Sequence, residues 1–224
     1  MSDRALVVFV KAPQPGAAKT RLIPILGPEG AAALYRGMAG IVLAATTPRP
    51  AEYERLVFFD PPGAAGELRS WLPGLRLIPQ SGSDLGARMC HALAHALHRG
   101  ARRAAVIGTD TPEVDRKRVS EALAALEAAD LVLGPAEDGG YYLLALSRPR
   151  PELFAGVAWG TPAVREETLE RAAALGLRVH ELPSLRDIDT AADLRAEWPK
   201  LRRRLAFDPE LVRAIDSALA RHPG

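Results

Sequence analysis

Short apolar runs alternate with longer helical segments along almost the whole chain, and this alternation constrains the fold more than any other feature. Each run has the length of a buried strand and is bounded by polar residues, glycine or proline. Strands that are separated by helices form a mainly parallel sheet with helices on both faces. The sequence predicts strands at residues 5–10, 56–59, 75–78, 104–107, 131–134, 141–146 and 178–182.

The segments between these strands have helical spacing of their apolar residues. Two of the predicted helices carry clear start signals: Thr190 and Asp193 form a capping-box pattern, and Asp208 precedes a proline that suits the first helical position. The sequence predicts helices at residues 29–45, 64–71, 84–99, 114–129, 162–175, 191–205 and 209–221.

The connection between residues 131–134 and 141–146 is too short for a helical crossover, so we expect one of these two strands to run antiparallel. The chain has 224 residues and shows no internal repeat, low-complexity tract or long linker. We therefore expect one α/β domain over residues 1–224, large enough to bury a substantial core.

Composition excludes several classes of protein. Hydrophobic residues make up 48% and charged residues 25%, which is ordinary for a globular protein, and the formal net charge of +2 argues against a nucleic-acid-coating role. The single cysteine, Cys90, excludes an intramolecular disulfide framework and is expected to be a buried, unreactive thiol. Without a long apolar stretch or a signal-peptide pattern at the N-terminus, the expected location is cytoplasmic, with no membrane span.

A cationic loop follows the first strand. It carries Lys11, Lys19 and Arg21, and it holds two of the four lysines of a chain that has 25 arginines. Cationic loops at the ends of first strands are where α/β proteins hold anionic ligands, usually phosphates. A solvated turn remains the alternative on local grounds.

This loop is neither a Walker P-loop nor a Rossmann fingerprint. Proline occupies position 13 and alanine position 18, where a P-loop needs glycines, and no Gly-x-Gly-x-x-Gly follows the strand. Any phosphate here is therefore expected to be bound by lysine and arginine side chains rather than by a backbone cradle.

Acidic residues follow several of the other strands, and the carboxyl ends of parallel strands meet at one edge of the sheet. Asp110 follows a strand directly, and we favour a metal or substrate role for it over helix capping. Asp138 precedes Gly139 and Gly140 and fits a turn as well as a site. Asp189 is the better ligand candidate beside Asp187. Since Mg²⁺ takes one or two protein carboxylates plus phosphate oxygens, a metal-bound phosphate is expected at this edge.

Four ordered motifs resemble a known family over residues 5–195. They are Lys11 with residues 16–22 (Gly-Ala-Ala-Lys-Thr-Arg-Leu), residues 108–112 (Gly-Thr-Asp-Thr-Pro), residues 134–143 (Gly-Pro-Ala-Glu-Asp-Gly-Gly-Tyr-Tyr-Leu) and residues 187–194 (Asp-Ile-Asp-Thr-Ala-Ala-Asp-Leu). Residues 80–89, Gln-x-Gly-x-Asp-Leu-Gly-x-Arg-Met, fit the same pattern. Together they resemble the bacterial glycosyltransferase-like proteins related to 2-phospholactate guanylyltransferase and the molybdenum-cofactor guanylyltransferases. The resemblance implies the GT-A fold, a three-layer α/β sandwich that binds a nucleotide and a divalent metal.

Positions are carried over from this family one by one. Asp110 and Asp189 match its metal-binding acids for Mg²⁺ or Mn²⁺, and Lys19 and Arg21 match the residues that hold the phosphates. The resemblance thus implies Lys19, Arg21 and Asp110 as catalytic residues. The wider nucleotide and substrate site is expected to include Lys11, Gly16, Gln80, Asp138, Gly139, Gly140 and Trp159; for Trp159, stacking on a base or sugar and burial in the core remain equally open.

Two departures from the family leave the reaction open. Sugar-transferring members often have Asp-x-Asp where this chain has Thr109-Asp110-Thr111, and nucleotidyl-transferring members often have a glycine-rich first loop. We expect a metal-dependent transferase that uses an activated nucleotide, and the resemblance favours a nucleotide-sugar glycosyltransferase. The alternatives are a guanylyl- or cytidylyltransferase acting on a phosphorylated small molecule, and a non-catalytic nucleotide-binding protein. The acceptor, the base preference and the oligomeric state stay open.

Overall fold

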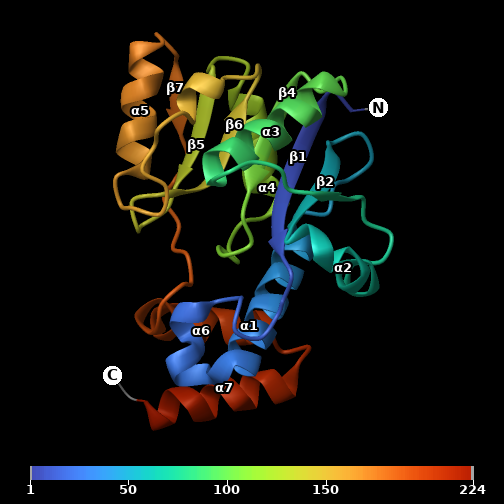
Figure 1. The fold of residues 1–224 in the computed structure, drawn as a ribbon, viewed down its shortest axis with the longest axis vertical. Helices are drawn as coiled ribbons and strands as arrows, with labels where there is room; N and C mark the ends of the chain where they lie inside the picture. The colour runs from blue at the N-terminus through green and yellow to red at the C-terminus, as the bar shows by residue number, and fades with distance from the viewer. Residues whose placement is uncertain (1, 223–224) are drawn as a thin grey trace.

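The computed structural model describes residues 2–222 and contains a seven-stranded sheet of order β3-β2-β1-β4-β6-β5-β7 (Figure 1). β6 is antiparallel to its neighbours β4 and β5, and the other pairs are parallel. The antiparallel strand expected from the short connection is therefore confirmed. The strands are β1 (Arg4–Lys11), β2 (Glu54–Asp60), β3 (Leu77–Pro79), β4 (Arg103–Ile107), β5 (Leu131–Pro135), β6 (Tyr141–Leu146) and β7 (Val179–Glu181).

All seven predicted helices are present, with shifted boundaries. The first begins earlier than predicted, at Ile23. An additional helical turn precedes the predicted helix and is joined to it across a kink at Gly27, which has a φ of 69°. The fourth begins later, at Arg116, because Asp115 caps it by accepting a hydrogen bond from the backbone N–H of Arg118. The helices are α1 (Ile23–Ala45), α2 (Ala65–Trp71), α3 (Leu85–His98), α4 (Arg116–Ala125), α5 (Val164–Ala174), α6 (Ala191–Arg204) and α7 (Pro209–Arg221).

Helices cover both faces of the sheet, as the alternation of side chains along β1 requires. Leu6, Val8 and Val10 pack in one core with residues of α1, α2 and α4. Ala5 and Val7 face the other way and pack with residues of α3 and α5. The result is a three-layer α/β/α sandwich.

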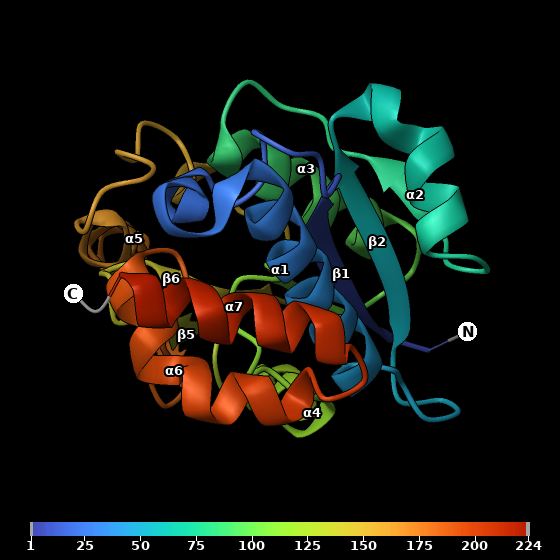
Figure 2. The same ribbon diagram turned by 90° about the horizontal axis from the view of Figure 1, so that it is seen from below.

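A third apolar core lies beyond one end of the sheet, where α6 and α7 pack against α1 (Figures 1 and 2). The predicted capping box is confirmed, since the hydroxyl of Thr190 accepts from the N–H of Asp193 and the carboxylate of Asp193 accepts from the N–H of Thr190. Asp208 caps α7 as predicted. Within residues 2–222, the structure contains no helix that combines the length and the apolar character needed to cross a bilayer.

The segment that leads from β7 to α6 crosses the carboxyl edge of the sheet on its way to this third core. The N–H of Ile188 donates to the carbonyl oxygen of Asp110 over 3.0 Å, which places the two acidic loops side by side. The folding of the C-terminal helices thus brings Asp187 and Asp189 to the end of β4.

Candidate active site

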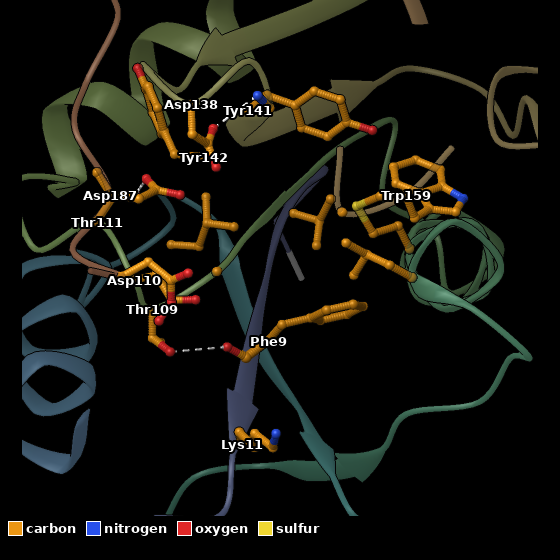
Figure 3. Close-up of a pocket in the computed structure, with 18 of the residues that line it drawn as sticks. Phe9, Lys11, Thr109, Asp110, Thr111, Asp138, Tyr141, Tyr142, Trp159 and Asp187 are labelled. Atoms are coloured by element: carbon orange, nitrogen blue, oxygen red, sulfur yellow. Dashed lines mark hydrogen bonds between the residues drawn. The ribbon is translucent and has the colours of Figure 1, made fainter. Parts of the chain in front are cut away.

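A cavity of about 740 Å³ opens at the carboxyl ends of the parallel strands, where the sequence predicts a site. Its walls come from the loop after β1, the loop after β4, the turn between β5 and β6, the segment before α5 and the segment before α6. Carboxylates lie at one end of this cavity and aromatic side chains at the other (Figure 3). One end is therefore suited to cations and phosphates, and the other to an apolar or planar group.

Lys19 is the central residue of the charged end. Its backbone is in the left-handed region, with φ 47° and ψ 48°, immediately before the short helical turn Thr20–Leu22. Leu22 is fully buried in the third core and anchors this turn. The side chain of Lys19 is only 3% exposed, and its Nζ lies 2.5 Å from Oδ1 of Asp110 and 3.7 Å from Oδ1 of Asp189. The ammonium therefore bridges the two acids that the sequence predicts as metal ligands.

The other two cations of the loop are placed differently. Arg21 is 68% exposed, and its Nη1 lies 3.0 Å from Oδ2 of Asp189. Lys11 lines the cavity with an exposed side chain at the end of β1. The structure thus brings Lys19 and Arg21 together at the acids. Lys11 lies apart from Asp110 and Asp187, along the wall (Figure 3).

Asp187 points into the same end of the cavity. Its carboxylate accepts a hydrogen bond from the hydroxyl of Thr111. Burial raises the pKa of Asp187 to about 6, and the negative charges of Asp110 and Asp138 act in the same direction. The sequence named Asp187 only as the weaker alternative to Asp189, because its burial depends on how the α6 segment crosses the sheet.

The charged end fits a divalent cation that is shared with a ligand. Among residues 2–222, no three histidine, cysteine, aspartate or glutamate side chains converge closely enough to hold an ion by themselves. Asp110 and Asp189 instead form a pair close enough for one ammonium to contact both. Carboxylate oxygens are the donors that Mg²⁺ and Mn²⁺ prefer, and two of them with phosphate oxygens and water complete such a site. The position of the Lys19 ammonium indicates where positive charge is stabilised.

Of four further predicted residues, two line the cavity and two shape the loops beside it. Gln80 and Gly140 line the cavity, and the side-chain amide of Gln80 donates to the carbonyl oxygen of Phe58 over 3.2 Å. Gly139 does not line it; its φ is 91°, and a Cβ there would lie 2.1 Å from the carbonyl oxygen of Pro162. Gly16 also lies outside the lining, with a φ of 81° that explains the glycine. Gly139 and Gly16 therefore shape loops and do not form the cavity wall.

Asp138 combines both roles that the sequence left open. Its Oδ1 accepts from the N–H of Gly140 over 2.9 Å, which is turn chemistry, and its side chain also lines the cavity.

Trp159 likewise both packs and lines the cavity. Its ring stacks on Phe154 at a centroid distance of 6.4 Å and meets the edge of Tyr141 at 6.5 Å. The indole lies directly on α3, because a Cβ at Gly86 would be 2.4 Å from Cζ2 of Trp159. Trp159, Leu85 and other apolar residues form the aromatic end of the cavity.

Several lining residues were not predicted from sequence. Asp60 and Arg88 lie on the wall and form an ion pair of 3.4 Å. Tyr35 and Thr109 are buried beneath the wall and share a hydrogen bond of 3.0 Å. Asp60 ends β2 and Thr109 follows β4, which is a usable signal, whereas a tyrosine on an apolar helix face cannot be distinguished from a core residue by sequence.

Comparison with known proteins places the chain in a family. Residues 43–161 match the family described as "Uncharacterized protein conserved in bacteria (DUF2064)". The chain belongs to this family. This DUF2064 member is also 33% identical over 201 residues, or 86% of its own length and 87% of the relative, to a phosphoenolpyruvate guanylyltransferase from Geodermatophilus obscurus. Both findings agree with the resemblance seen in the motifs.

Solved structures confirm the GT-A fold. A protein from Desulfovibrio desulfuricans G20, assigned as a nucleotide-diphospho-sugar transferase, superposes with a TM-score of 0.86 at 32% identity, over 95% of this chain and 98% of that one. A protein from Mycobacterium tuberculosis H37Rv, solved in complex with manganese, superposes with a TM-score of 0.50 at 17% identity, over 86% and 96% of the chains. The DUF2064 member is a transferase.

Proposed function

We propose that the protein is a metal-dependent nucleotidyltransferase that transfers a nucleoside monophosphate, most simply GMP from GTP, to a phosphorylated small molecule. The observation that carries this proposal is the pair Asp110 and Asp189, bridged by the buried ammonium of Lys19 at the end of a nucleotide-sized cavity. Such a cluster provides both signs of charge that a metal-bound polyphosphate requires.

The choice of nucleotidyl transfer over sugar transfer rests on the relative from Geodermatophilus obscurus, whose name specifies guanylyl transfer to phosphoenolpyruvate. The resemblance to the glycosyltransferase-like proteins favoured sugar transfer, whereas the motifs left the reaction open. The relative spans most of this chain and is named for a reaction in which an acceptor phosphate takes a nucleotide, so we revise that preference.

In this reaction an acceptor phosphate oxygen attacks the α-phosphorus of the nucleoside triphosphate. The bond from the α-phosphorus to the oxygen that bridges to the β-phosphorus breaks, and pyrophosphate leaves with that oxygen. Lys19 and Arg21 lie where they can neutralise the charge that builds on the departing phosphates. Asp110 and Asp189 are the side chains that would hold the metal. Mg²⁺ or Mn²⁺, the latter bound by the Mycobacterium tuberculosis structure of the same fold, would supply Lewis-acid activation and orient the phosphates.

The rest of the cavity is assigned to the base and the acceptor. Trp159 offers an aromatic surface for a base, and Gln80 has a side-chain oxygen free to accept a hydrogen bond, since its amide nitrogen donates to Phe58. Lys11 provides an exposed cation on the wall and is assigned to the phosphate of the acceptor.

Transfer of a sugar is the second candidate, because the protein from Desulfovibrio desulfuricans is assigned as a nucleotide-diphospho-sugar transferase. The same cations and carboxylates would then stabilise a departing nucleoside diphosphate while an acceptor hydroxyl attacks the anomeric carbon.

One experiment separates the two reactions. The protein is incubated with Mn²⁺ or Mg²⁺ and, in separate arms, with nucleoside triphosphates plus phosphoenolpyruvate or phosphorylated hydroxy acids, and with nucleotide sugars plus hydroxyl acceptors. Pyrophosphate release that needs the phosphorylated acceptor supports nucleotidyl transfer. Release of nucleoside diphosphate from a nucleotide sugar, without pyrophosphate in the other arm, would contradict it.

A further inference from the structure

Two partly buried backbone groups at the end of β1 have no neighbouring strand on one side. The ladder between β1 and β4 ends at the pair Val8 and Ile107, whereas the ladder between β1 and β2 continues to Lys11. The N–H of Ala12 donates to a carbonyl of β2, so the preceding N–H, that of Lys11, points to the side that β4 has left. The carbonyl oxygen of Phe9 points to the same side, and such groups need hydrogen-bond partners.

Two side-chain hydroxyls take the place of the missing strand. The N–H of Lys11 donates to the phenol oxygen of Tyr35 over 2.7 Å, and that phenol lies 3.0 Å from Oγ1 of Thr109. Oγ1 of Thr109 is in turn 3.5 Å from the carbonyl oxygen of Phe9 (Figure 3). Tyr35 is 4% exposed and Thr109 is 2% exposed, so water does not compete for these bonds.

The donors and acceptors in this chain of bonds have one consistent order. A carbonyl oxygen can only accept, so Thr109 uses its hydrogen for Phe9 and accepts from Tyr35. The phenol oxygen of Tyr35 in turn accepts from the N–H of Lys11. Burial raises the pKa of Tyr35, and the negative charge of Asp110 raises it further, so the phenol keeps the hydrogen that this order needs.

These hydrogen bonds matter for Asp110 because packing does not hold its side chain, which is 50% exposed. Its backbone is held instead by the N–H of Ile188, which donates to its carbonyl oxygen, and by its two neighbours, which are both buried. Thr109 is tied to β1 and α1 through Tyr35, and Thr111 is tied to Asp187. In the Thr-Asp-Thr triplet, the two threonines act as anchors on either side of the exposed acid.

We infer that Tyr35 is a positioning residue for the reaction: its phenol fixes Thr109 against β1 and thereby sets Asp110 at the place where it meets the metal-bound nucleotide. This inference rests on the proposed function only in giving Asp110 a metal to hold. It assigns a functional role to Tyr35, a residue of α1 under the cavity that sequence alone does not distinguish from a core residue.

The test compares Tyr35→Phe with Tyr53→Phe in the full-length protein. Tyr53 is a matched control, because it is also 4% exposed and its hydroxyl also makes a buried bond, of 2.8 Å to the carbonyl oxygen of Thr46, away from the cavity. Calorimetry measures the affinity for a GTP analogue that cannot release pyrophosphate, with and without Mn²⁺. The ratio of the two affinities reports the metal site independently of turnover.

Tyr35→Phe is expected to reduce the gain in affinity from Mn²⁺ by about tenfold, as loss of an outer partner of a metal ligand typically does, while the metal-free affinity stays unchanged. Where pyrophosphate release with Mn²⁺ is observed, kcat/KM for the nucleotide should fall by a similar factor, because the nucleotide binds less tightly together with the metal. Thr109→Val should reproduce this effect and Thr109→Ser, which keeps the hydroxyl, should restore the gain. An equal Mn²⁺ gain in Tyr35→Phe, Tyr53→Phe and the wild type would overturn the inference, as would the absence of any gain in the wild type. Failure of the proposed reaction would show separately, as no pyrophosphate released.

Discussion

The ammonium of Lys19 lies 2.5 Å from Oδ1 of Asp110 and joins the loop after the first strand to the loop after the fourth. Because the lysine is in the left-handed region just before a helical turn, its side chain is directed under the loop and into the acids. A bound polyphosphate would attract the same ammonium, so phosphate and Asp110 share one cation. This contact connects the cationic and acidic motifs that were recognised separately in the sequence.

Replacing this lysine by a neutral side chain of similar length should abolish most of the activity. We expect Lys19→Met to lower kcat/KM by about 10²–10³-fold, because one preorganised positive charge is lost from the leaving phosphates. Steady-state pyrophosphate release measures this. Lys200→Met is the control, since Lys200 is exposed on α6 and pairs only with Glu113 and Glu197 in the described residues. Equal activity of Lys19→Met and Lys200→Met would contradict the role.

Arg21 should affect activity far more than stability. Its ion pair with Asp189 is largely exposed, and pairs of this kind contribute about 0–1 kcal/mol to the free energy of unfolding. We therefore expect Arg21→Ala to unfold in urea within about 1 kcal/mol of the wild type while KM for the nucleotide rises at least several-fold. A large loss of stability with an unchanged KM would show that Arg21 has a structural role and does not bind the nucleotide.

The buried carboxyl of Asp187 predicts a specific dependence of stability on pH. Its folded-state pKa, about 6, lies above the ordinary value of 3.8, so the folded protein holds a proton that the unfolded chain has released between these values. The free energy of unfolding should therefore fall as pH rises from about 4 to about 6, and the full penalty should persist above pH 6.

Asp187→Asn removes this penalty without removing the acceptor for Thr111. We expect the variant to be more stable than the wild type by about 1–2 kcal/mol at pH 8, with allowance for partial solvent exposure, and nearly equal to it at pH 4. Urea unfolding at the two pH values measures the difference. A variant that is less stable than the wild type at pH 8 would contradict the assignment.

The course of the fold and the location of the site could be predicted from sequence because both follow from local rules. Alternating strands and helices imply the sandwich, and the carboxyl-end rule brings Lys19, Asp110 and Asp189 to one edge. The capping signals at Thr190 and Asp208 are short-range and are confirmed in the structure.

The features that could not be predicted depend on contacts between distant segments. The burial of Asp187 requires the α6 segment to cross the sheet, and the role of Tyr35 requires β4 to end before β1. Gly16 matched a motif of the family, yet its positive φ serves the loop rather than the cavity wall. The motifs predicted which loops meet at the cavity, but they did not separate the residues that line it from those that support the loops.

The position of Trp159 can be tested through α3. Gly86→Ala places a methyl group 2.4 Å from Cζ2 of Trp159, so the indole must shift from its present position. We expect KM for the nucleotide to rise by roughly fivefold or more and stability to fall by about 1–3 kcal/mol. Gly40→Ala in α1 is the control: its Cβ meets no atom within 4 Å, and it should stabilise the protein by about 0.5–1 kcal/mol without changing kinetics. An unchanged KM in Gly86→Ala would show that Trp159 does not contact the nucleotide.

Nucleotidyl transfer through Asp110 is tested most directly by following a label on the α-phosphate of GTP. The wild type, with Mn²⁺ and a phosphorylated acceptor, should move the label into a new product joined to the acceptor by a P–O–P phosphoanhydride bond and release one pyrophosphate for each label transferred. Asp110→Asn should lose this transfer by about 10²-fold or more while keeping its fold by circular dichroism. Two results would contradict nucleotidyl transfer through Asp110. One is an Asp110→Asn variant that transfers the label as fast as the wild type. The other is a wild type that leaves the label in free nucleotide while transferring a sugar from a nucleotide sugar.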